Sequence, residues 1–347
     1  MPKNIVVFSD GTGNKPFEDH DTNVRKPYDA VKKIRTDQVA FYDGGVGTDF
    51  WRIMGLAFAK GLAKNIRECY EFIVYHYQPG DSIFLFGFSR GAFTARSLGG
   101  GLTGRCGILK RKYAEKVDEA FDLYQEKAAT PTVQKFASAH SHKDQSGELV
   151  KDIHFISAWD TVGSVGLPDF VKKWANFSLR KIGFKRRIIS FHDTKLSEKV
   201  SFAYHAISID DKRKSFYPRL WDERQKQDQV IEQVWFPGVY SNVEGGYVLQ
   251  GLSDITLRWM LLRAVKHDLK VSPEIWGSIS PDENSKLYDS RGRYIAIEER
   301  NILNMWGEVS AQKVKVHVSA RDRINNPDNN YHPQNLPGSY DVVSDDG

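Results

Sequence analysis

A chain of 347 residues, 40% of them hydrophobic and 27% charged, is long enough to bury a large core and has the composition of a folded globular protein. Its net charge of +5 is small, and because no nucleic-acid-binding motif accompanies it, nucleic acid is excluded as the expected partner. The two cysteines, Cys69 and Cys106, have neither metal nor redox spacing. We therefore expect reduced thiols, no metal site and no cofactor.

The apolar run Ile5–Phe8 predicts a buried strand, because it is too short for the apolar region of a signal peptide. No segment reaches the roughly 18 apolar residues that a membrane-spanning helix needs. We therefore expect a soluble, cytoplasmic protein. Export by a route that needs no cleaved signal stays compatible with this expectation.

Short apolar runs alternate with longer segments of helical periodicity, which is typical of a mostly parallel sheet with helices on both faces. The predicted strands are Ile5–Phe8, Val39–Tyr42, Ile83–Phe86, Ile153–Ile156, Ser201–Ile209, Val230–Phe236 and Val314–Val318. The predicted helices are Leu56–Tyr77, Gly91–Leu102, Lys110–Lys127 and Ser253–Leu269, the last capped by Ser253 and Asp254. Since no repeat or long linker interrupts the pattern, residues 1–347 are predicted to form a single α/β domain with an irregular tail from about residue 325.

The segment Gly87–Gly91 reads G-F-S-R-G and lies between a predicted strand and a predicted helix. This is the context of a nucleophile elbow, in which a serine sits on a strained turn between strand and helix. Ser89 is therefore the predicted nucleophile, and the backbone N–H of Arg90, at the helix N-terminus, is the predicted oxyanion-hole donor. The motif in this context indicates a serine hydrolase of the α/β-hydrolase type.

The glycine-rich loop from Asp10 to Asn14 follows the first predicted strand. Its backbone near Gly11 and Thr12 is the candidate for a second oxyanion donor or for substrate binding. A simple strand-to-helix turn explains the same residues, and an anion-binding turn is a further alternative. Nucleotide binding is the weakest of these, because the loop has no Walker lysine.

Residues 170–191 contain no acidic residue. Basic side chains alternate there with apolar ones: Lys172, Lys173, Trp174, Phe177, Arg180, Lys181, Phe184, Lys185, Arg186, Arg187 and Ile188. Cationic heads beside apolar side chains suit transient contact with a lipid surface. The alternative is a surface insertion, at about residues 165–195, whose aromatic rings pack on the body of the domain.

Seven blocks along the chain resemble the family of uncharacterised α/β-hydrolase domains (domain of unknown function 2235) that includes type VI secretion phospholipase effectors. The blocks are Phe8–Asn14, Tyr42–Thr48, Gly87–Arg96, Trp159–Gly163, Tyr204–Asp210, Trp235–Val239 and Tyr331–Pro337. The resemblance implies a serine esterase or phospholipase with a Ser-Asp-His triad and an ester or lipid substrate. Substrate identity does not follow from the fold.

One block departs from the family. Where the family pattern reads Gly-Val-His-Ser-Asp-Val-Gly-Gly-Gly-Tyr, this chain has Tyr240 in place of the histidine, Asn242 in place of the aspartate and Glu244 in place of the first glycine. The resemblance therefore places Tyr240 at the position of the general base. A tyrosine with an ordinary pKa of about 10 is a poor base at neutral pH.

Another histidine is the alternative base. We expect His205 to take this role, although its place inside a predicted strand is more typical of a histidine in the core or behind the site. His192 is expected to be exposed, and His154 lies in a strand with apolar neighbours.

Two aspartates are candidates for the acid of the triad. Asp160 follows a strand at the sheet edge where α/β proteins bind ligands, and Asp210 ends the next strand. A structural role is the alternative for both, since Asp160 can cap the turn that follows it and Asp210 can pair with Lys212 or Arg213.

Two functions therefore compete at the level of sequence. The first is a serine hydrolase of carboxylic esters, in which Ser89 forms an acyl-enzyme. The second is a catalytically impaired hydrolase fold that serves as a binding or regulatory module, because Tyr240 replaces the family histidine. The sequence leaves the oligomeric state open.

Overall fold

The computed structural model describes residues 2–11, 21–34, 36–45, 56–126, 128–161, 196–223, 228–290 and 297–346. Within these ranges eight strands form one sheet in the order β2-β1-β3-β4-β5-β6-β7-β8. All neighbouring strands are parallel. The strands are β1 Asn4–Ser9, β2 Gln38–Asp43, β3 Ser82–Phe88, β4 Ile153–Trp159, β5 Val200–Ser208, β6 Val230–Phe236, β7 Lys315–His317 and β8 Asp341–Val343.

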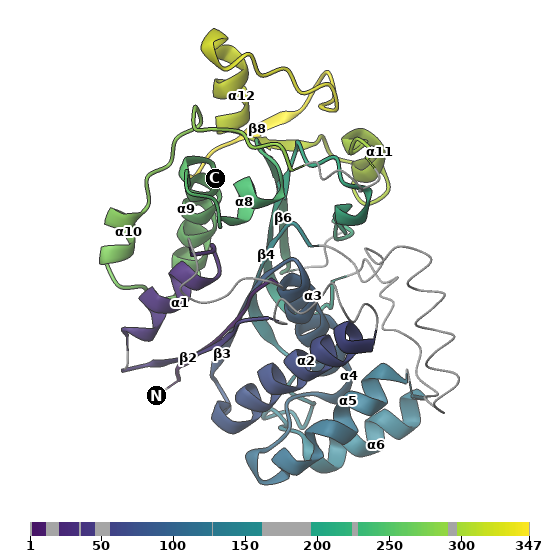
Figure 1. Ribbon diagram of the computed structural model, residues 1–347. Coiled ribbons are helices and arrows are strands. Elements are labelled where there is room, and N and C mark those ends of the chain that lie inside the picture. The colour runs from purple at the N-terminus through teal and green to yellow at the C-terminus, as the bar shows by residue number, and fades with distance from the viewer. Residues whose placement is uncertain are drawn as a thin grey trace.

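Helices cover both faces of the sheet (Figure 1). On one face lie α1 (Arg25–Lys32), α8 (Tyr240–Glu244), α9 (Gly251–Lys266) and α10 (Glu274–Ser278). The other face carries α2 (Leu56–His76), α3 (Arg90–Arg96), α4 (Thr103–Cys106), α5 (Val117–Gln125) and α6 (Thr130–His140). The helices α11 (Ile302–Gly307) and α12 (Val318–Asn325) pack near β7. The α/β-hydrolase-type fold with a parallel sheet is thus confirmed.

Each central strand contributes to two hydrophobic cores, because its side chains alternate between the faces of the sheet. In β1, Ile5 and Val7 join the core under α2, whereas Val6 and Phe8 join the core under α9. Both sets are buried, so the strand is apolar throughout rather than alternating with polar residues.

The order of the strands fixes where a site can form. Strand β1 pairs with β2 on one side and with β3 on the other, so the direction of winding reverses between β1 and β3. In parallel α/β sheets, ligands bind beyond the carboxyl ends of the strands at such a point. Asp10 follows β1 and Ser89 follows β3, which places both at this edge.

Two expectations about the elements are corrected. Helix α9 begins at Gly251, so Ser253 and Asp254 lie in its first turn and do not cap it; the Ser253 hydroxyl donates to the carbonyl of Gln250. The tail, expected to be irregular, contains β8, which pairs with β7 at the edge of the sheet. The unpaired edge of a short strand offers hydrogen-bonding groups to a nearby segment, and the tail uses them.

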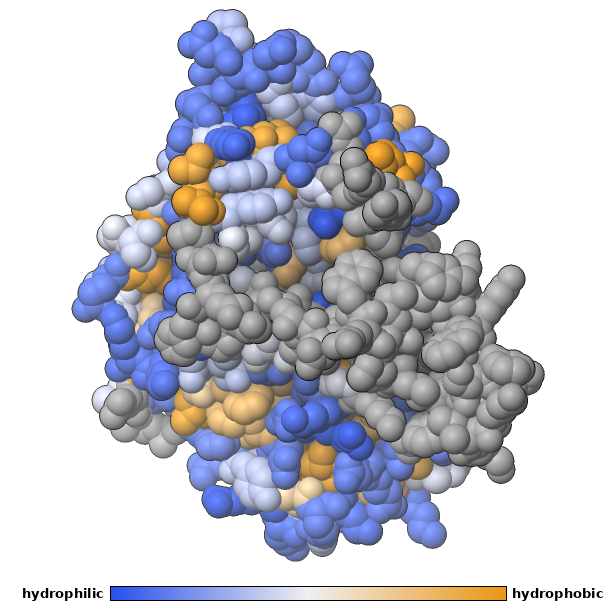
Figure 2. All heavy atoms as spheres, in the orientation of Figure 1, coloured by the Kyte–Doolittle hydropathy of each residue, from blue (hydrophilic) through white to orange (hydrophobic). Residues whose placement is uncertain are grey.

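No helix within the described ranges is both long enough and apolar enough to cross a membrane. On the face shown in Figure 2, apolar side chains form separate groups among larger hydrophilic areas. The proposed lipid-contacting residues 170–191, and the whole insertion at 165–195, lie outside the described residues.

Candidate active site

The elbow places Ser89 on a strained turn. Its backbone has φ 55° and ψ −113°, a conformation that L-residues rarely adopt. The turn is possible because a glycine stands on each side: a Cβ on Gly91 would lie 1.7 Å from the carbonyl oxygen of Ser9, and one on Gly87 would lie 2.3 Å from that of Gly91. The backbone N–H of Ser89 donates to the carbonyl of Trp159 at 3.2 Å, which ties the elbow to the end of β4.

Arg90 is the first residue of α3. Its backbone N–H belongs to the first turn, where N–H groups point out of the helix and attract negative charge. Burial lowers the pKa of the Arg90 side chain to about 10, while the nearby Tyr240 and Glu244 act in the opposite direction. The guanidinium is therefore still charged at neutral pH, close to two of the three residues that depart from the family pattern.

Tyr240 lies beside Ser89, at the start of α8. Its ring packs against Phe88 and Phe216, each with a centroid distance of 4.8 Å, and only 5% of the residue is exposed. The backbone N–H of Tyr240 donates to the Asp211 carboxylate at 3.2 Å, which fixes the start of the helix. The resemblance places position 240 at the base, and in the structure its ring contacts Phe88, the residue before Ser89.

The phenol of Tyr240 is a weak base in this setting. Burial and the nearby Glu244 raise its pKa well above the ordinary value, and the Ser89 hydroxyl only partly opposes this shift. The two hydroxyls are thus close, but they do not form a regular hydrogen bond, since Tyr240 Oη has no partner of good geometry among the described residues. A neutral phenol beside Ser89 can donate a hydrogen bond, but it cannot act as the final acceptor of the serine proton, because it would have to pass its own proton to another group.

Glu244 is a buried carboxyl one helical turn beyond Tyr240. It is 6% exposed, and its Oε1 accepts a hydrogen bond of 3.2 Å from the Ser241 hydroxyl. Burial raises the pKa of Glu244 well above its usual range, and the carboxylates of Asp10 and Asp160 add to this shift. The sequence shows Glu244 in place of a glycine of the family pattern but indicates no role for it. This difference from the pattern is the one feature of the sequence that points to the residue.

Asp160 and Arg300 form an ion pair with both side chains completely buried. Two parallel hydrogen bonds of 2.9 Å join the guanidinium to the carboxylate, and the Ser208 hydroxyl donates to Asp160 at 2.8 Å. Burial raises the pKa of Asp160, and Arg300 opposes that shift. Asp160 also has a positive φ of 37°. Its charge acts on Tyr240, so it lies close to the position of the base, yet its carboxylate is held by Arg300.

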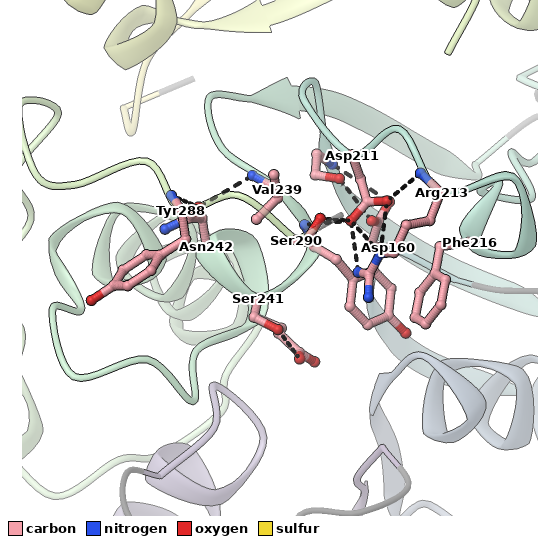
Figure 3. A network of polar contacts seen from close by, with 12 residues as sticks. Asp160, Asp211, Arg213, Phe216, Val239, Ser241, Asn242, Tyr288 and Ser290 are labelled. Carbon is pink, nitrogen blue, oxygen red and sulfur yellow. Dashed lines mark hydrogen bonds and ion pairs between the residues drawn. The ribbon is translucent and has the colours of Figure 1, made fainter. Parts of the chain in front are cut away.

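A second carboxylate supports the site from the neighbouring loop (Figure 3). Asp211 pairs with Arg213 at 2.7 Å and also accepts a hydrogen bond of 3.2 Å from Ser290. The Arg213 guanidinium, by pairing with the carboxylate, outweighs burial and lowers the pKa of Asp211. Arg213 lies 3.7 Å from the centre of the Phe216 ring. Arg213 thus pairs with Asp211 and not with Asp210, the alternative that the sequence offered. Arg300, which is 140 residues from Asp160 in the chain, could not be recognised from local sequence.

His205 is not placed as a general base. Its Nε2 accepts the backbone N–H of Thr161 at 3.1 Å, and Nδ1 faces Gln233 Oε1 at 3.3 Å, so both ring nitrogens are engaged. Burial lowers its pKa to about 3. These contacts give His205 a structural role between β4 and β6. His154, likewise, contacts the carbonyl of His267, and His192 lies outside the described residues.

Asp210 is held by contacts with the end of β6 and with the tail. Its Oδ2 accepts hydrogen bonds from the backbone N–H of Gly238 at 2.6 Å and from the Tyr331 hydroxyl at 2.8 Å. It lines a cavity of about 320 Å³ together with residues of the tail, including His332 and Asn335. Of the two candidate acids, Asp160 is the one whose charge helps to raise the pKa of Tyr240.

The second oxyanion donor is not supplied by Gly11. Its backbone N–H donates to Asp10 Oδ1 at 2.7 Å, and the other oxygen of Asp10 accepts from Thr22 and Tyr42 at 2.6 and 2.7 Å. The Asp10 carboxylate thus accepts hydrogen bonds from Gly11, Thr22 and Tyr42. These bonds connect the end of β1 with β2 and with the residues before α1. Thr12 lies outside the described residues.

The described residues contain no group of three His, Cys, Asp or Glu side chains arranged to hold a metal ion. What they bring together is a serine on an elbow, a helix N-terminus, a buried tyrosine and a buried glutamate. Such a site has a nucleophile and a donor for developing negative charge. Among the described residues, no imidazole is placed to accept the proton of the serine, as one usually does in such sites.

Comparison with known proteins gives a family match over most of the chain. The family described as T6SS, Phospholipase effector Tle1-like, catalytic domain matches residues 3–263. An uncharacterized protein of Saccharomyces cerevisiae is 29% identical over 240 residues, which make up 62% of this chain and 32% of that protein.

Two solved structures are similar at lower identity. The crystal structure of an uncharacterized protein from Pseudomonas aeruginosa has 17% identity and a TM-score of 0.42, with 82% of this chain and 49% of that chain covered. The Tle1 effector bound to the VgrG spike from the type 6 secretion system has 16% identity and a TM-score of 0.38, with 72% and 52% covered. This chain spans about half the length of each of these structures and about a third of the yeast relative.

Proposed function

This chain belongs to the family of T6SS phospholipase effector Tle1-like catalytic domains, and from this membership we propose that it hydrolyses carboxylic ester bonds of lipids through an acyl-enzyme on Ser89. The observation that carries the proposal is the strained backbone of Ser89 between β3 and α3. Strain of this kind costs about 1–3 kcal/mol and is kept where function requires it.

The geometry suggests how the reaction begins. Ser89 Oγ attacks the acyl carbon, and the oxygen of the carbonyl becomes negatively charged. The backbone N–H of Arg90 and the N-terminus of α3 lie next to the serine and stabilise that charge. The rings of Phe88, Phe216 and Tyr240 form an apolar wall beside the nucleophile, and such a wall suits an acyl chain. Residues 170–191 are the proposed contact with the lipid surface.

A second function is favoured by one observation, the buried Tyr240 at the position of the family histidine. Without a base, a hydrolase fold still binds its ligand, and the residual catalysis from binding and the oxyanion hole reaches about 10³–10⁴-fold over water. Weak turnover of an activated ester is therefore compatible with a binding or regulatory module. Only turnover of a lipid ester that depends on Ser89 separates the two functions.

The test compares the wild type with Ser89→Ala on short- and long-chain p-nitrophenyl esters and on a fluorogenic phospholipid. A matched control is Ser157→Ala, because Ser157 is also completely buried but lies within β4 and its hydroxyl has no partner among the described residues. We expect Ser89→Ala to remove phospholipid turnover and Ser157→Ala to retain it. Equal, near-background rates for wild type and Ser89→Ala would refute the hydrolase and favour the binding module.

A further inference from the structure

Glu244 has an unused carboxylate oxygen inside the site. Its Oε1 is bonded to Ser241, but Oε2 is buried and has no hydrogen-bond partner among the described residues. Buried polar atoms without a partner are rare in native proteins. A catalytic role is one of the explanations for such an atom, beside strain and a bound water or ion.

Glu244 and Tyr240 share one face of α8. They are four residues apart, which places their Cβ atoms about 5–6 Å from each other on the helix surface. Both residues are buried, and the negative charge of Glu244 acts on the Tyr240 phenol. Tyr240 Oη in turn lies beside the Ser89 hydroxyl. Tyr240 is thus close to Ser89 and lies one helical turn from Glu244.

The charges around Glu244 come from several elements. Asp10 after β1 and Asp160 after β4 are negative, whereas Arg213 after β5 and Arg90 at the start of α3 are positive. Burial and the two aspartates raise the pKa of Glu244, and Arg213 opposes them. A carboxylate with a raised pKa is a stronger base than an exposed one, and the best general base has a pKa near the working pH.

We propose that Glu244 is the final proton acceptor for Ser89 and that the proton reaches it through the Tyr240 hydroxyl. This inference rests on the proposed function, because it explains how Ser89 is activated with Tyr240 in place of the family histidine. Hydrogen bonds of this kind are often long in a free enzyme and tighten when substrate binds.

The proton transfers balance in both directions. As Ser89 Oγ bonds to the acyl carbon, its proton passes to Tyr240 Oη, and the proton of Tyr240 passes to Glu244 Oε2. When the bond from the acyl carbon to the alcohol oxygen breaks, Glu244 returns a proton to Tyr240, and Tyr240 protonates the leaving alcohol. The products are acyl-Ser89, a free alcohol and an ionised Glu244. Water then takes the place of the alcohol and releases the acid by the same transfers.

The test uses the rate at which a phosphonate reagent labels Ser89, because labelling needs an activated serine but no lipid hydrolysis. Since only ionised Glu244 accepts a proton, labelling of the wild type is expected to rise with pH and to level off above the raised pKa of Glu244. Glu244→Gln is expected to lose this rise and to label roughly 100- to 10,000-fold more slowly, the range of general base catalysis. The matched control is Glu223→Gln, another buried glutamate with a raised pKa, which contacts Gln233 instead of the elbow.

Substitutions of Tyr240 distinguish a role in proton transfer to Glu244 from a structural role of the two residues. Tyr240→Phe is expected to label as slowly as Glu244→Gln. The double variant Tyr240→Phe/Glu244→Gln is expected to label no more slowly than either single variant, because the effects of residues that act as a unit do not add. In a Tyr240→His background the imidazole accepts the proton directly, so adding Glu244→Gln is expected to change the rate less than threefold. Thermal unfolding of each variant verifies the fold.

The outcomes for Glu244 and for the proposed hydrolase are distinct. Glu244→Gln with a wild-type rate and pH profile would overturn the role of Glu244, whatever the phospholipid assay shows. Slow labelling of Glu244→Gln in a protein without phospholipid turnover would support the proton path and refute the hydrolase. Wild-type labelling no faster than that of Ser89→Ala would overturn both.

Discussion

Asp160 and Arg300 show how single residues hold the site together. Asp160 directly follows β4, and Arg300 comes from a segment 140 residues later in the sequence. The guanidinium also donates to the carbonyls of Ser208 and Phe216, so one arginine fastens several segments around Asp160. Removing either residue leaves a buried charge without its partner. The resulting loss of stability is far larger than the difference in stability between the ion pair and a pair of apolar residues at the same positions.

We predict that Arg300→Met lowers the free energy of unfolding by about 3–5 kcal/mol. Urea unfolding measures the loss. Arg321→Met is the control, since Arg321 pairs with Asp322 on the surface with 47% of its side chain exposed, where substitutions usually change stability by less than about 0.5 kcal/mol. Adding Asp160→Asn to Arg300→Met is expected to restore part of the loss. An equal effect at positions 300 and 321 would contradict the prediction.

The sequence made Ser89 recognisable, because an elbow needs its glycines at fixed spacing next to the serine. It also marked Tyr240 as a departure from a family pattern. The partners of these residues were not predictable in the same way. Arg300 reaches Asp160 only in the folded chain, and a strand pattern indicates that His205 is buried but not which atoms meet its two nitrogens.

At the scale of elements, long apolar strands were predictable, and short elements that depend on their neighbours were not. Strands β1 and β3 are buried on both faces and therefore stand out as continuous apolar runs. Helix α8 has five residues and β8 has three, too few for any periodicity. Their positions follow from tertiary contacts: Asp211 holds the start of α8, and β7 pairs with β8.

The packing of α3 on β1 leads to a prediction about the elbow. A methyl group on Gly91 would lie 1.7 Å from the carbonyl oxygen of Ser9, which belongs to the backbone of β1 and cannot move alone. Gly91→Ala is therefore expected to push α3 from the sheet, to lower stability by at least about 1–3 kcal/mol and to remove Ser89 labelling. Thermal unfolding and phosphonate labelling measure the two effects.

Gly100→Ala is the control for this prediction. Gly100 also lies in the helical segment after the elbow, but the nearest atom to its added Cβ is 3.9 Å away. Alanine there is expected to leave stability unchanged or to raise it by up to about 1 kcal/mol, because it restricts the unfolded chain. Similar melting temperatures for the two variants would show that the contact between α3 and β1 is looser than the structure indicates.

For the molecule as a whole, buried acids make stability depend on pH. Asp43, the last residue of β2, has a pKa raised from 3.8 to about 6, because burial outweighs its hydrogen bonds from Ser9 and Gly45. The folded state thus prefers the neutral acid. Its contribution to stability is complete below about pH 4, where the carboxyl is also protonated in the unfolded chain. It is lost as the pH rises through 6.

We predict that Asp43→Asn removes this dependence. The shift corresponds to about 3 kcal/mol, at about 1.4 kcal/mol for each pH unit. Urea unfolding is expected to show that the free energy of unfolding of the wild type falls between pH 4 and 7. In Asp43→Asn this fall is expected to be smaller by about 3 kcal/mol. The control is Asp118→Asn, since the side chain of Asp118 is 78% exposed. Parallel curves for wild type and Asp43→Asn would exclude Asp43 as the titrating group.

The order of strands in the sheet has a consequence for how the chain folds as it is synthesised. Strands β1, β2 and β3 pair with one another within the first 88 residues, and every later strand in the described chain joins beside the strand made before it. The sheet can therefore grow in the direction of translation, and each new strand finds its partner already in place. At every stage after β3, two edges are open to wrong pairing: the free side of β2 and that of the newest strand.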